Sequence, residues 1–205
     1  MTTNGKRDDR GDELRMRATT QGGSIVAIGV LCLVIGLIGG AMLARPGSPP
    51  NTAATGTAHV YVSVAYNPYT GLDEYFPANF TVPANVPVII TITNYDNGTN
   101  LVPSDFASVR GTVGGTESVT DATAADRVLT SVPATEVTHT FTIMSGDLNV
   151  NVPIPAAQGT TLTVVTFTLQ FSQTGPIYWH CMAPCDPQAM STPGFMTGTI
   201  TVVNG

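Results

Sequence analysis

The sequence predicts a mainly β protein: a single N-terminal transmembrane helix followed by a Greek-key β-sandwich. Three observations lead to this prediction. One long stretch near the N-terminus contains no charged residue. The remainder is made of short β-branched or Thr-alternating segments, separated by clusters of Gly, Pro, Asn and Asp. The 205 residues are 42% hydrophobic and only 11% charged, a composition that excludes disorder driven by charge repulsion.

The expected transmembrane helix runs from residue 24 to residue 44. A helix rises about 1.5 Å per residue, so this segment is long enough to cross a bilayer core of roughly 30 Å. A cleaved signal peptide is the alternative, but the polar leader of residues 1–23 carries acidic residues, and the apolar run exceeds a signal-peptide core. The basic residues of the leader place it in the cytoplasm, with the β domain outside the cell membrane.

Residues 45–57 are rich in Pro, Gly and Thr and are expected to form a linker, and residues 58–205 to form the extracytoplasmic domain. No amphipathic helix is expected in that domain, and residues 102–126 are expected to form a polar insertion without regular structure. The expected strands are His59–Ala65, Tyr75–Val82, Val88–Asn94, Arg127–Val132, Val137–Met144, Leu148–Val152, Thr160–Phe171, Ile177–Cys181 and Met196–Val203.

The charge distribution excludes nucleic-acid binding. Only two of the 8 basic residues, Arg110 and Arg127, follow residue 45, whereas ten of the 14 acidic residues do. Such a domain cannot neutralise several phosphates. The sequence also shows no nucleophile elbow, phosphate-binding loop or paired-carboxylate motif, so we do not expect the chain to be catalytic by itself.

Four residues have the chemistry of a copper electron-transfer site. His139 lies in an expected strand, where it shares a face with Phe141. Cys181 ends the penultimate strand, Cys185 follows in the loop, and Met196 begins the last strand. Thiolate, imidazole and thioether donors are the soft ligands that copper prefers.

These residues give the chain a resemblance to the cupredoxin family, and within it to the copper-A domain of cytochrome c oxidase subunit II. That domain combines an N-terminal anchor, an outward β-sandwich, a first His in a strand and a C-x3-C loop followed by His and Met. The resemblance implies a cupredoxin-like sandwich in a respiratory haem–copper terminal oxidase, whose partner catalytic subunit alone would hold haem. It assigns His139 as the first imidazole, Cys181 and Cys185 as bridging thiolates, the Ala183 carbonyl as a ligand and Met196 as the thioether.

The loop departs from the family pattern. Ala189 occupies the position of the second imidazole, and Met196 comes eleven residues after Cys185. No His follows His180, whose side chain is expected to point to the opposite face of its strand from Cys181. The resemblance therefore implies a subunit II-like protein with a degenerate or lost copper-A site, as in oxidases fed by quinol. The alternatives are a membrane-anchored mononuclear copper electron carrier of sulfocyanin type and a non-redox surface β-sandwich.

Several of these residues have other interpretations. Cys181 and Cys185 could form a disulfide outside the cytosol, hold copper or stay free, and we expect the disulfide with little or no copper. His139 could be a buried, hydrogen-bonded histidine. Trp179, Tyr178 and Phe141 are expected to pack rather than to relay electrons. Asn79 and Asn97 lie in Asn-x-Thr sequences and are candidate glycosylation sites.

Overall fold

The computed structural model of the chain describes residues 56–122 and 125–205. The expected leader (1–23), the expected transmembrane helix (24–44) and all but the last two residues of the expected linker lie outside the described residues. Among the helices that the structure does describe, none has the length and apolar character needed to cross a membrane.

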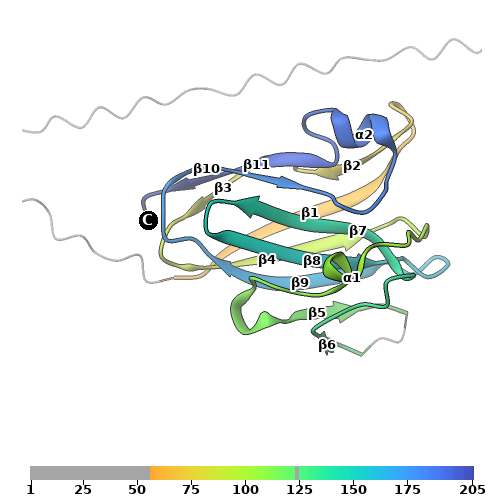
Figure 1. Cartoon of the computed structure of the whole chain (residues 1–205), viewed down its shortest axis with the longest axis horizontal. Coiled ribbons are helices and arrows are strands. Elements are labelled where there is room, and N and C mark those ends of the chain that lie inside the picture. The colour runs from red at the N-terminus through yellow and green to blue at the C-terminus, as the bar shows by residue number, and fades with distance from the viewer. Residues whose placement is uncertain (1–55, 123–124) are drawn as a thin grey trace, which may run out of the picture. The chain divides into compact units, whose positions relative to one another are not determined.

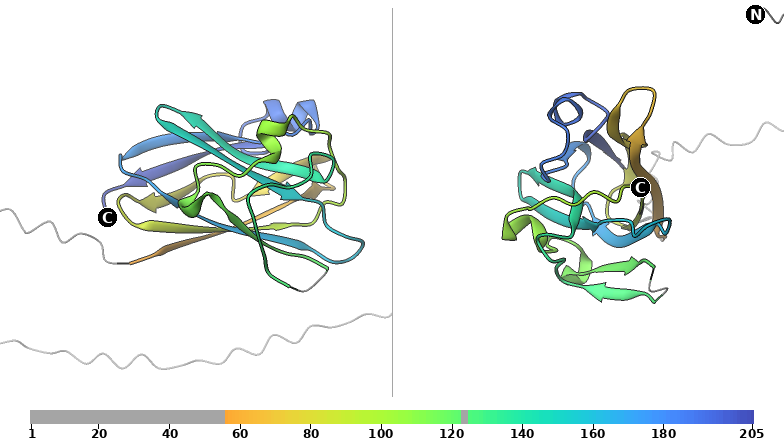
Figure 2. Two further views of the ribbon diagram at one scale, coloured as in Figure 1. Left: turned by 60° about the horizontal axis from the view of Figure 1, so that its bottom comes forward. Right: turned by 90° about the vertical axis from the view of Figure 1, so that its right-hand side faces the viewer.

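The described chain folds into two facing β-sheets, as Figures 1 and 2 show. The mainly β sandwich predicted from the sequence is confirmed. The 6-stranded sheet has the order β2 (Leu72–Phe76), β1 (Ala58–Asn67), β4 (Pro87–Asn94), β9 (Thr163–Gln170), β5 (Glu117–Thr120) and β6 (Arg127–Leu129). The 5-stranded sheet has the order β3 (Phe80–Pro83), β11 (Thr197–Val203), β10 (Gly175–His180), β7 (Val137–Ser145) and β8 (Leu148–Pro155).

Two of the strand pairs are parallel, and each brings together strands that are not consecutive in the sequence. β1 lies parallel to β4, and β3 lies parallel to the last strand, β11. The other pairings between these strands are antiparallel, including β7 with β8 and β10 with β11. In β4 the side chains alternate between buried and partly exposed, as expected for a strand with one face on the core.

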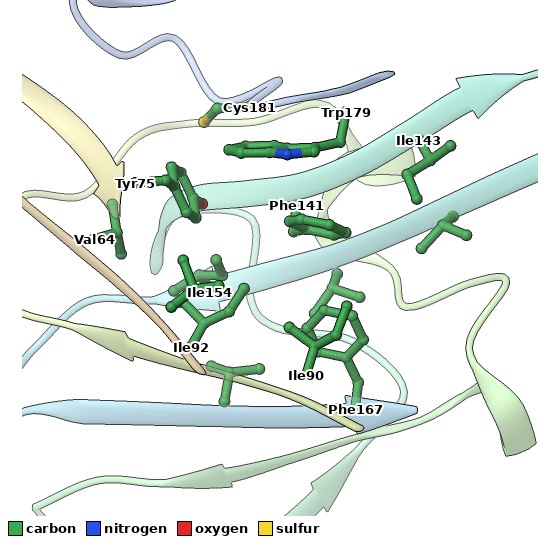
Figure 3. Packing of buried hydrophobic residues seen from close by; sticks show 14 of the residues in the cluster. Val64, Tyr75, Ile90, Ile92, Phe141, Ile143, Ile154, Phe167, Trp179 and Cys181 are labelled. Atoms are coloured by element: carbon green, nitrogen blue, oxygen red, sulfur yellow. The ribbon is translucent and has the colours of Figure 1, made fainter. Parts of the chain in front are cut away.

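The core lies between the two sheets and is shown in Figure 3. Trp179 of β10 stacks on Phe141 of β7, with ring centroids 5.0 Å apart. Tyr75 of β2 packs edge-on against Trp179 at 4.8 Å, and Trp179 Nε1 donates a hydrogen bond to the carbonyl of Ala78 at 2.9 Å. Trp179 and Phe141 are fully buried, in keeping with the expected packing role, whereas Tyr178 is exposed.

The single strand predicted over residues 75–82 is wrong. β2 ends at Phe76 in the 6-stranded sheet, and β3 begins at Phe80 in the other sheet. Pro77 lies between them and has no N–H to donate to a ladder, so the chain crosses from one sheet to the other here.

The expectation of no regular structure over residues 102–126 is also wrong. This segment contains a short helix α1 (Ser104–Ala107), a 3-10 turn η1 (Val113–Gly115) and β5, which extends the sheet by pairing with β9. A second short helix, α2 (Pro187–Ser191), lies in the loop after Cys185, where no helix was expected. Asp186 caps α2 by accepting hydrogen bonds from the N–H groups of Gln188 and Ala189, and Pro187 occupies a first-turn position that needs no donor.

Candidate metal centre

Three neighbouring strands of the 5-stranded sheet bring the predicted ligands to one end of the sandwich. β10 pairs with β11 on one side and with β7 on the other, so the ends of these strands are adjacent. His139 lies on β7, and Cys181 directly follows β10. Met196 directly precedes β11, and Cys185 lies in the loop that precedes α2.

His139, Cys181 and Cys185 meet in a compact cluster. His139 Nδ1 lies 3.1 Å from Cys185 Sγ and 4.0 Å from Cys181 Sγ. The two sulfur atoms are 3.3 Å apart and are not joined by a disulfide. All three ligand atoms fall within 4.8 Å of one another, and His139 and Cys181 are 2% and 1% exposed. The structure therefore assembles three of the four predicted donors in one site, in which Cys185 is the partly exposed member.

Met196 lies next to this cluster through its backbone. Its carbonyl accepts a hydrogen bond from the N–H of Cys181 at 2.8 Å, and its side chain is buried. Its N–H donates to the carbonyl of Ala189 at 3.4 Å, which ties α2 to the start of β11. Ala189, at the family's second-imidazole position, is fully buried and supplies no donor side chain.

Hydrogen bonds from the strands and the loop fix the two cysteines. The N–H of Thr140 donates to Cys181 Sγ at 3.4 Å, and the N–H of Met182 donates to the hydroxyl of Thr140 at 2.7 Å. The N–H of Cys185 donates to the carbonyl of Ala183 at 2.7 Å. That same carbonyl is 4.0 Å from Cys181 Sγ, so the predicted carbonyl donor also lies at the edge of the cluster.

The structure adds two carboxylates that the sequence analysis missed. Asp96 Oδ2 lies 3.0 Å from His139 Nε2, on the side of the ring away from the sulfur atoms. Asp73 joins Asp96 and His139 in a second group whose ligand atoms lie within 4.8 Å of one another. Both carboxylates, with His139, Cys185 and Asp186, line a cavity of ≈ 320 Å³ at this end of the sandwich. The only sequence signal for Asp96 is its place just after the Val88–Asn94 strand, which is common for Asp.

The cluster stabilises a thiolate. Burial alone would raise the pKa of Cys181, but hydrogen bonds with Cys185 and His139 lower it well below its usual value. The hydrogen bond to Cys181, together with burial, raises the pKa of Cys185. His139 Nδ1 is nearer to Cys185 Sγ, so we assign the first negative charge to the pair of sulfur atoms rather than to Cys181 alone.

The same surroundings shift the pKa values of His139 and Asp73. Burial alone would lower the pKa of His139, but its hydrogen bonds to Asp96 and to Cys181 raise it to about 9. Burial, followed by the charge of Asp96, raises the pKa of the Asp73 carboxyl. Within the described residues, the cluster therefore combines an imidazolium, a shared thiolate and a neighbouring carboxylate.

Other singled-out residues lie away from the cluster. His180 is exposed, whereas the next residue, Cys181, is buried, as expected for side chains that point to opposite faces of the strand. His59 is exposed on β1. Asn79 is exposed and its side chain accepts a hydrogen bond from the N–H of Thr199 at 2.8 Å, while Asn97 is exposed beside the cavity. Glycosylation at either residue stays a prediction.

The donor set fits a soft metal ion. Thiolates and a neutral imidazole are ligands of copper and zinc, and thioether sulfur adds a preference for copper(I). The lowered pKa of Cys181 favours the thiolate form that binds metal. Burial of His139 and Cys181 limits the access of water to these two ligands. These residues are therefore suited to hold copper.

Comparison with known proteins finds solved structures that are similar to this chain at low sequence identity. No family model and no curated protein matches the chain. Reduced rusticyanin is 16% identical, with a TM-score of 0.39 over 72% of this chain and 79% of that one. Rusticyanin from Thiobacillus ferrooxidans is 15% identical, with a TM-score of 0.38 over 72% and 77%. Auracyanin B is 13% identical, with a TM-score of 0.36 over 71% and 88%.

Proposed function

We propose that this chain is a cupredoxin-like electron carrier with a mononuclear copper site built from His139, Cys181 and Cys185, with Met196 beside them. The observation that carries the proposal is the convergence of one imidazole and two thiol groups within 4.8 Å at a buried end of the sandwich. Copper bound there would exchange one electron between its +1 and +2 states.

The residues of the chain would hold the metal with little rearrangement. His139 and Cys181 are attached to adjacent, hydrogen-bonded strands, and Met196 is tied to Cys181 through the backbone. The N–H of Thr140 supports negative charge on Cys181 in both oxidation states. Ligands that keep their positions during electron transfer lower the barrier to that transfer.

A second candidate is the subunit II-like component of a haem–copper terminal oxidase, partnered by a haem-bearing catalytic subunit. Both sulfur atoms lie close to the same imidazole and 3.3 Å from each other, an arrangement compatible with two bridging thiolates. A bridged copper pair normally needs a second imidazole. His59 and His180 are exposed, and Ala189 is the buried residue at that position. We therefore place this candidate second.

Copper counting separates these candidates. The full-length chain is purified in detergent, its thiols are reduced and the reductant is removed. It is then titrated with copper(II) under argon, and bound copper is measured by elemental analysis and electron paramagnetic resonance. We expect one copper per chain, with a four-line spectrum and a visible sulfur-to-copper charge-transfer band. Cys181→Ser and His139→Ala should abolish that band. Cys32→Ser, which changes the cysteine outside the described residues, is the matched control and should leave it intact.

The other outcomes are distinct. Two coppers per chain with a seven-line spectrum would replace the mononuclear proposal with the subunit II-like site. A chain that binds no copper after reduction, and that carries a Cys181–Cys185 disulfide by mass spectrometry when isolated, would reject both copper sites. That last result would confirm the disulfide expected from the sequence.

A further inference from the structure

We propose that Asp96 is a positioning residue for the metal centre: it holds the Nε2–H of His139 so that Nδ1 faces the two cysteine sulfur atoms. The effect on metal affinity rests on the proposed function. The orientation of the imidazole does not, because it is a property of the metal-free chain.

The geometry places the two ring nitrogens of His139 in different surroundings. Nε2 is 3.0 Å from Asp96 Oδ2, whereas Nδ1 is 3.1 Å from Cys185 Sγ. A carboxylate accepts hydrogen bonds and cannot donate one, so Nε2 must carry a proton to make this contact. The nitrogen that can release its proton and give its lone pair to a metal is then Nδ1, which is the one beside the sulfur atoms.

Asp96 is itself held by contacts at each polar group. Its Oδ1 accepts a hydrogen bond from the N–H of Tyr66 at 3.0 Å. Its N–H donates to Asn94 Oδ1 at 3.0 Å, and its carbonyl accepts from Asn94 Nδ2 at 3.1 Å and from the N–H of Ala157 at 2.8 Å. Asn94 is fully buried and also donates to the carbonyl of Pro155 at 2.9 Å. These contacts fix the backbone of Asp96, and its carboxylate cannot turn away from His139 without also losing the hydrogen bond from the N–H of Tyr66.

This contact also joins the two sheets at the metal centre. His139 lies on β7 of the 5-stranded sheet, and Asp96 follows β4 of the 6-stranded sheet. One sheet thus carries the ligand, and the other sets the direction in which the ligand points. Loss of the contact would free the imidazole to rotate, and outer partners of this kind typically change metal affinity by about 10- to 100-fold.

The test compares two substitutions that each remove one carboxylate charge from the cavity. Asp96→Asn leaves a single oxygen acceptor where Asp96 serves both Tyr66 and His139. Asp73→Asn is the matched control, because Asp73 lies in the same cavity beside Asp96 and His139. The first measurement is nuclear magnetic resonance of ¹⁵N-histidine-labelled, reduced, metal-free protein, with the His139 signal assigned from a His139→Gln variant. The second is copper(I) affinity by competition with a chromophoric chelator.

We expect the wild type and Asp73→Asn to show a slowly exchanging Nε2–H for His139, and Asp96→Asn to lose that protection. We also expect copper(I) affinity to fall about 10- to 100-fold in Asp96→Asn and by less in Asp73→Asn. A rapidly exchanging Nε2–H in the wild type, or equal affinity losses in the two variants, would overturn the proposal. If wild-type protein binds no copper(I) while Nε2–H is protected only when Asp96 is present, the metal function fails and the positioning of His139 stands.

Discussion

At the scale of single residues, Glu117 on β5 is an ionisable residue in a buried position. It is 1% exposed, and within the described part of the chain neither carboxylate oxygen has a hydrogen-bond partner. Burial raises the pKa of this carboxyl to about 8. Glu117 therefore stays largely protonated at neutral pH, because the folded state disfavours the carboxylate.

The raised pKa of Glu117 predicts that its contribution to stability depends on pH. The protonated Glu117 side chain contributes fully to the free energy of unfolding below the ordinary carboxyl pKa of 4.5, and this contribution is lost as pH rises through about 8. Between these two pH values the folded state keeps the proton, whereas the unfolded state has released it. The whole loss is on the order of 5 kcal/mol. Urea unfolding from pH 4 to pH 9 should show that Glu117→Gln, which does not titrate, gains stability relative to wild type as pH rises. Glu117→Leu should behave in the same way, and profiles parallel to wild type in both variants would contradict the prediction.

The buried position of Ala189 leads us to expect that Ala189→His destabilises the chain, whereas the family resemblance suggests that it would restore a ligand. An imidazole there would restore the ligand pattern by sequence, but Ala189 is fully buried in α2, and its carbonyl accepts the N–H of Met196. A side chain as large as His has no space at this position, and overpacking typically costs about 1–3 kcal/mol. We expect Ala189→His to lower the thermal unfolding temperature of the metal-free chain. Gln188→His, at the exposed neighbouring position, is the control, and an equal effect of both substitutions would argue against overpacking.

At the scale of secondary-structure elements, β11 fits closely against β3 and β10 because residue 198 is glycine. A Cβ atom there would lie 1.9 Å from the Ala78 carbonyl oxygen and 2.7 Å from Trp179 Nε1. These are the two atoms of the buried hydrogen bond between Trp179 and Ala78. The position thus links the last strand, the core tryptophan and the crossing between β2 and β3.

We expect Gly198→Ala to destabilise the domain by about 3 kcal/mol or more, because a backbone atom, and not a flexible side chain, would have to move. The midpoint of chemical denaturation measures the loss. Gly98→Ala is the control, since a Cβ there meets no atom within 4 Å and its φ is not positive. A Gly198→Ala variant as stable as Gly98→Ala would show that β11 has room for a side chain.

The strands were predictable as elements, but their partners were not. Alternation of apolar residues with Thr marks which face of a strand is buried, as in β4, but it does not say that β1 pairs with β4 or β3 with β11. The break between β2 and β3 was missed because one proline interrupts an otherwise strand-like run.

In the site, His139, Cys181 and Cys185 were predictable because soft donors are rare in this chain. Asp96 was not, because its role depends on how the two sheets face each other.

At the scale of the whole molecule, the charges are divided between the ends of the sequence. Six of the 8 basic residues lie within residues 1–45, and ten of the 14 acidic residues follow them. This asymmetry around an uncharged apolar segment is the basis for our proposal that residues 1–23 are cytoplasmic and the β domain is outside the cell.

The proposed topology predicts which part of the chain a protease reaches. Protease added to intact cells or to right-side-out vesicles should remove the β domain and spare the leader, because the membrane shields only the cytoplasmic side. Antibodies against epitopes added to each end would follow the two parts, and detergent-permeabilised cells provide the control in which both are digested. Cleavage within residues 1–20 in sealed vesicles would contradict the proposed topology.

Trp179 gives the molecule a built-in optical reporter. It is the single tryptophan of the chain, fully buried and two residues before Cys181. Tyr75 contacts both Trp179 and the candidate ligand His139, with its ring centroid 4.8 Å from that of Trp179 and 6.0 Å from that of His139. Indole shielded from water fluoresces at shorter wavelengths than indole in water, so unfolding should shift the emission to the red. Copper held by Cys181 should instead quench the emission without shifting it, so a single fluorescence spectrum distinguishes a chain that has lost its metal from one that has lost its fold.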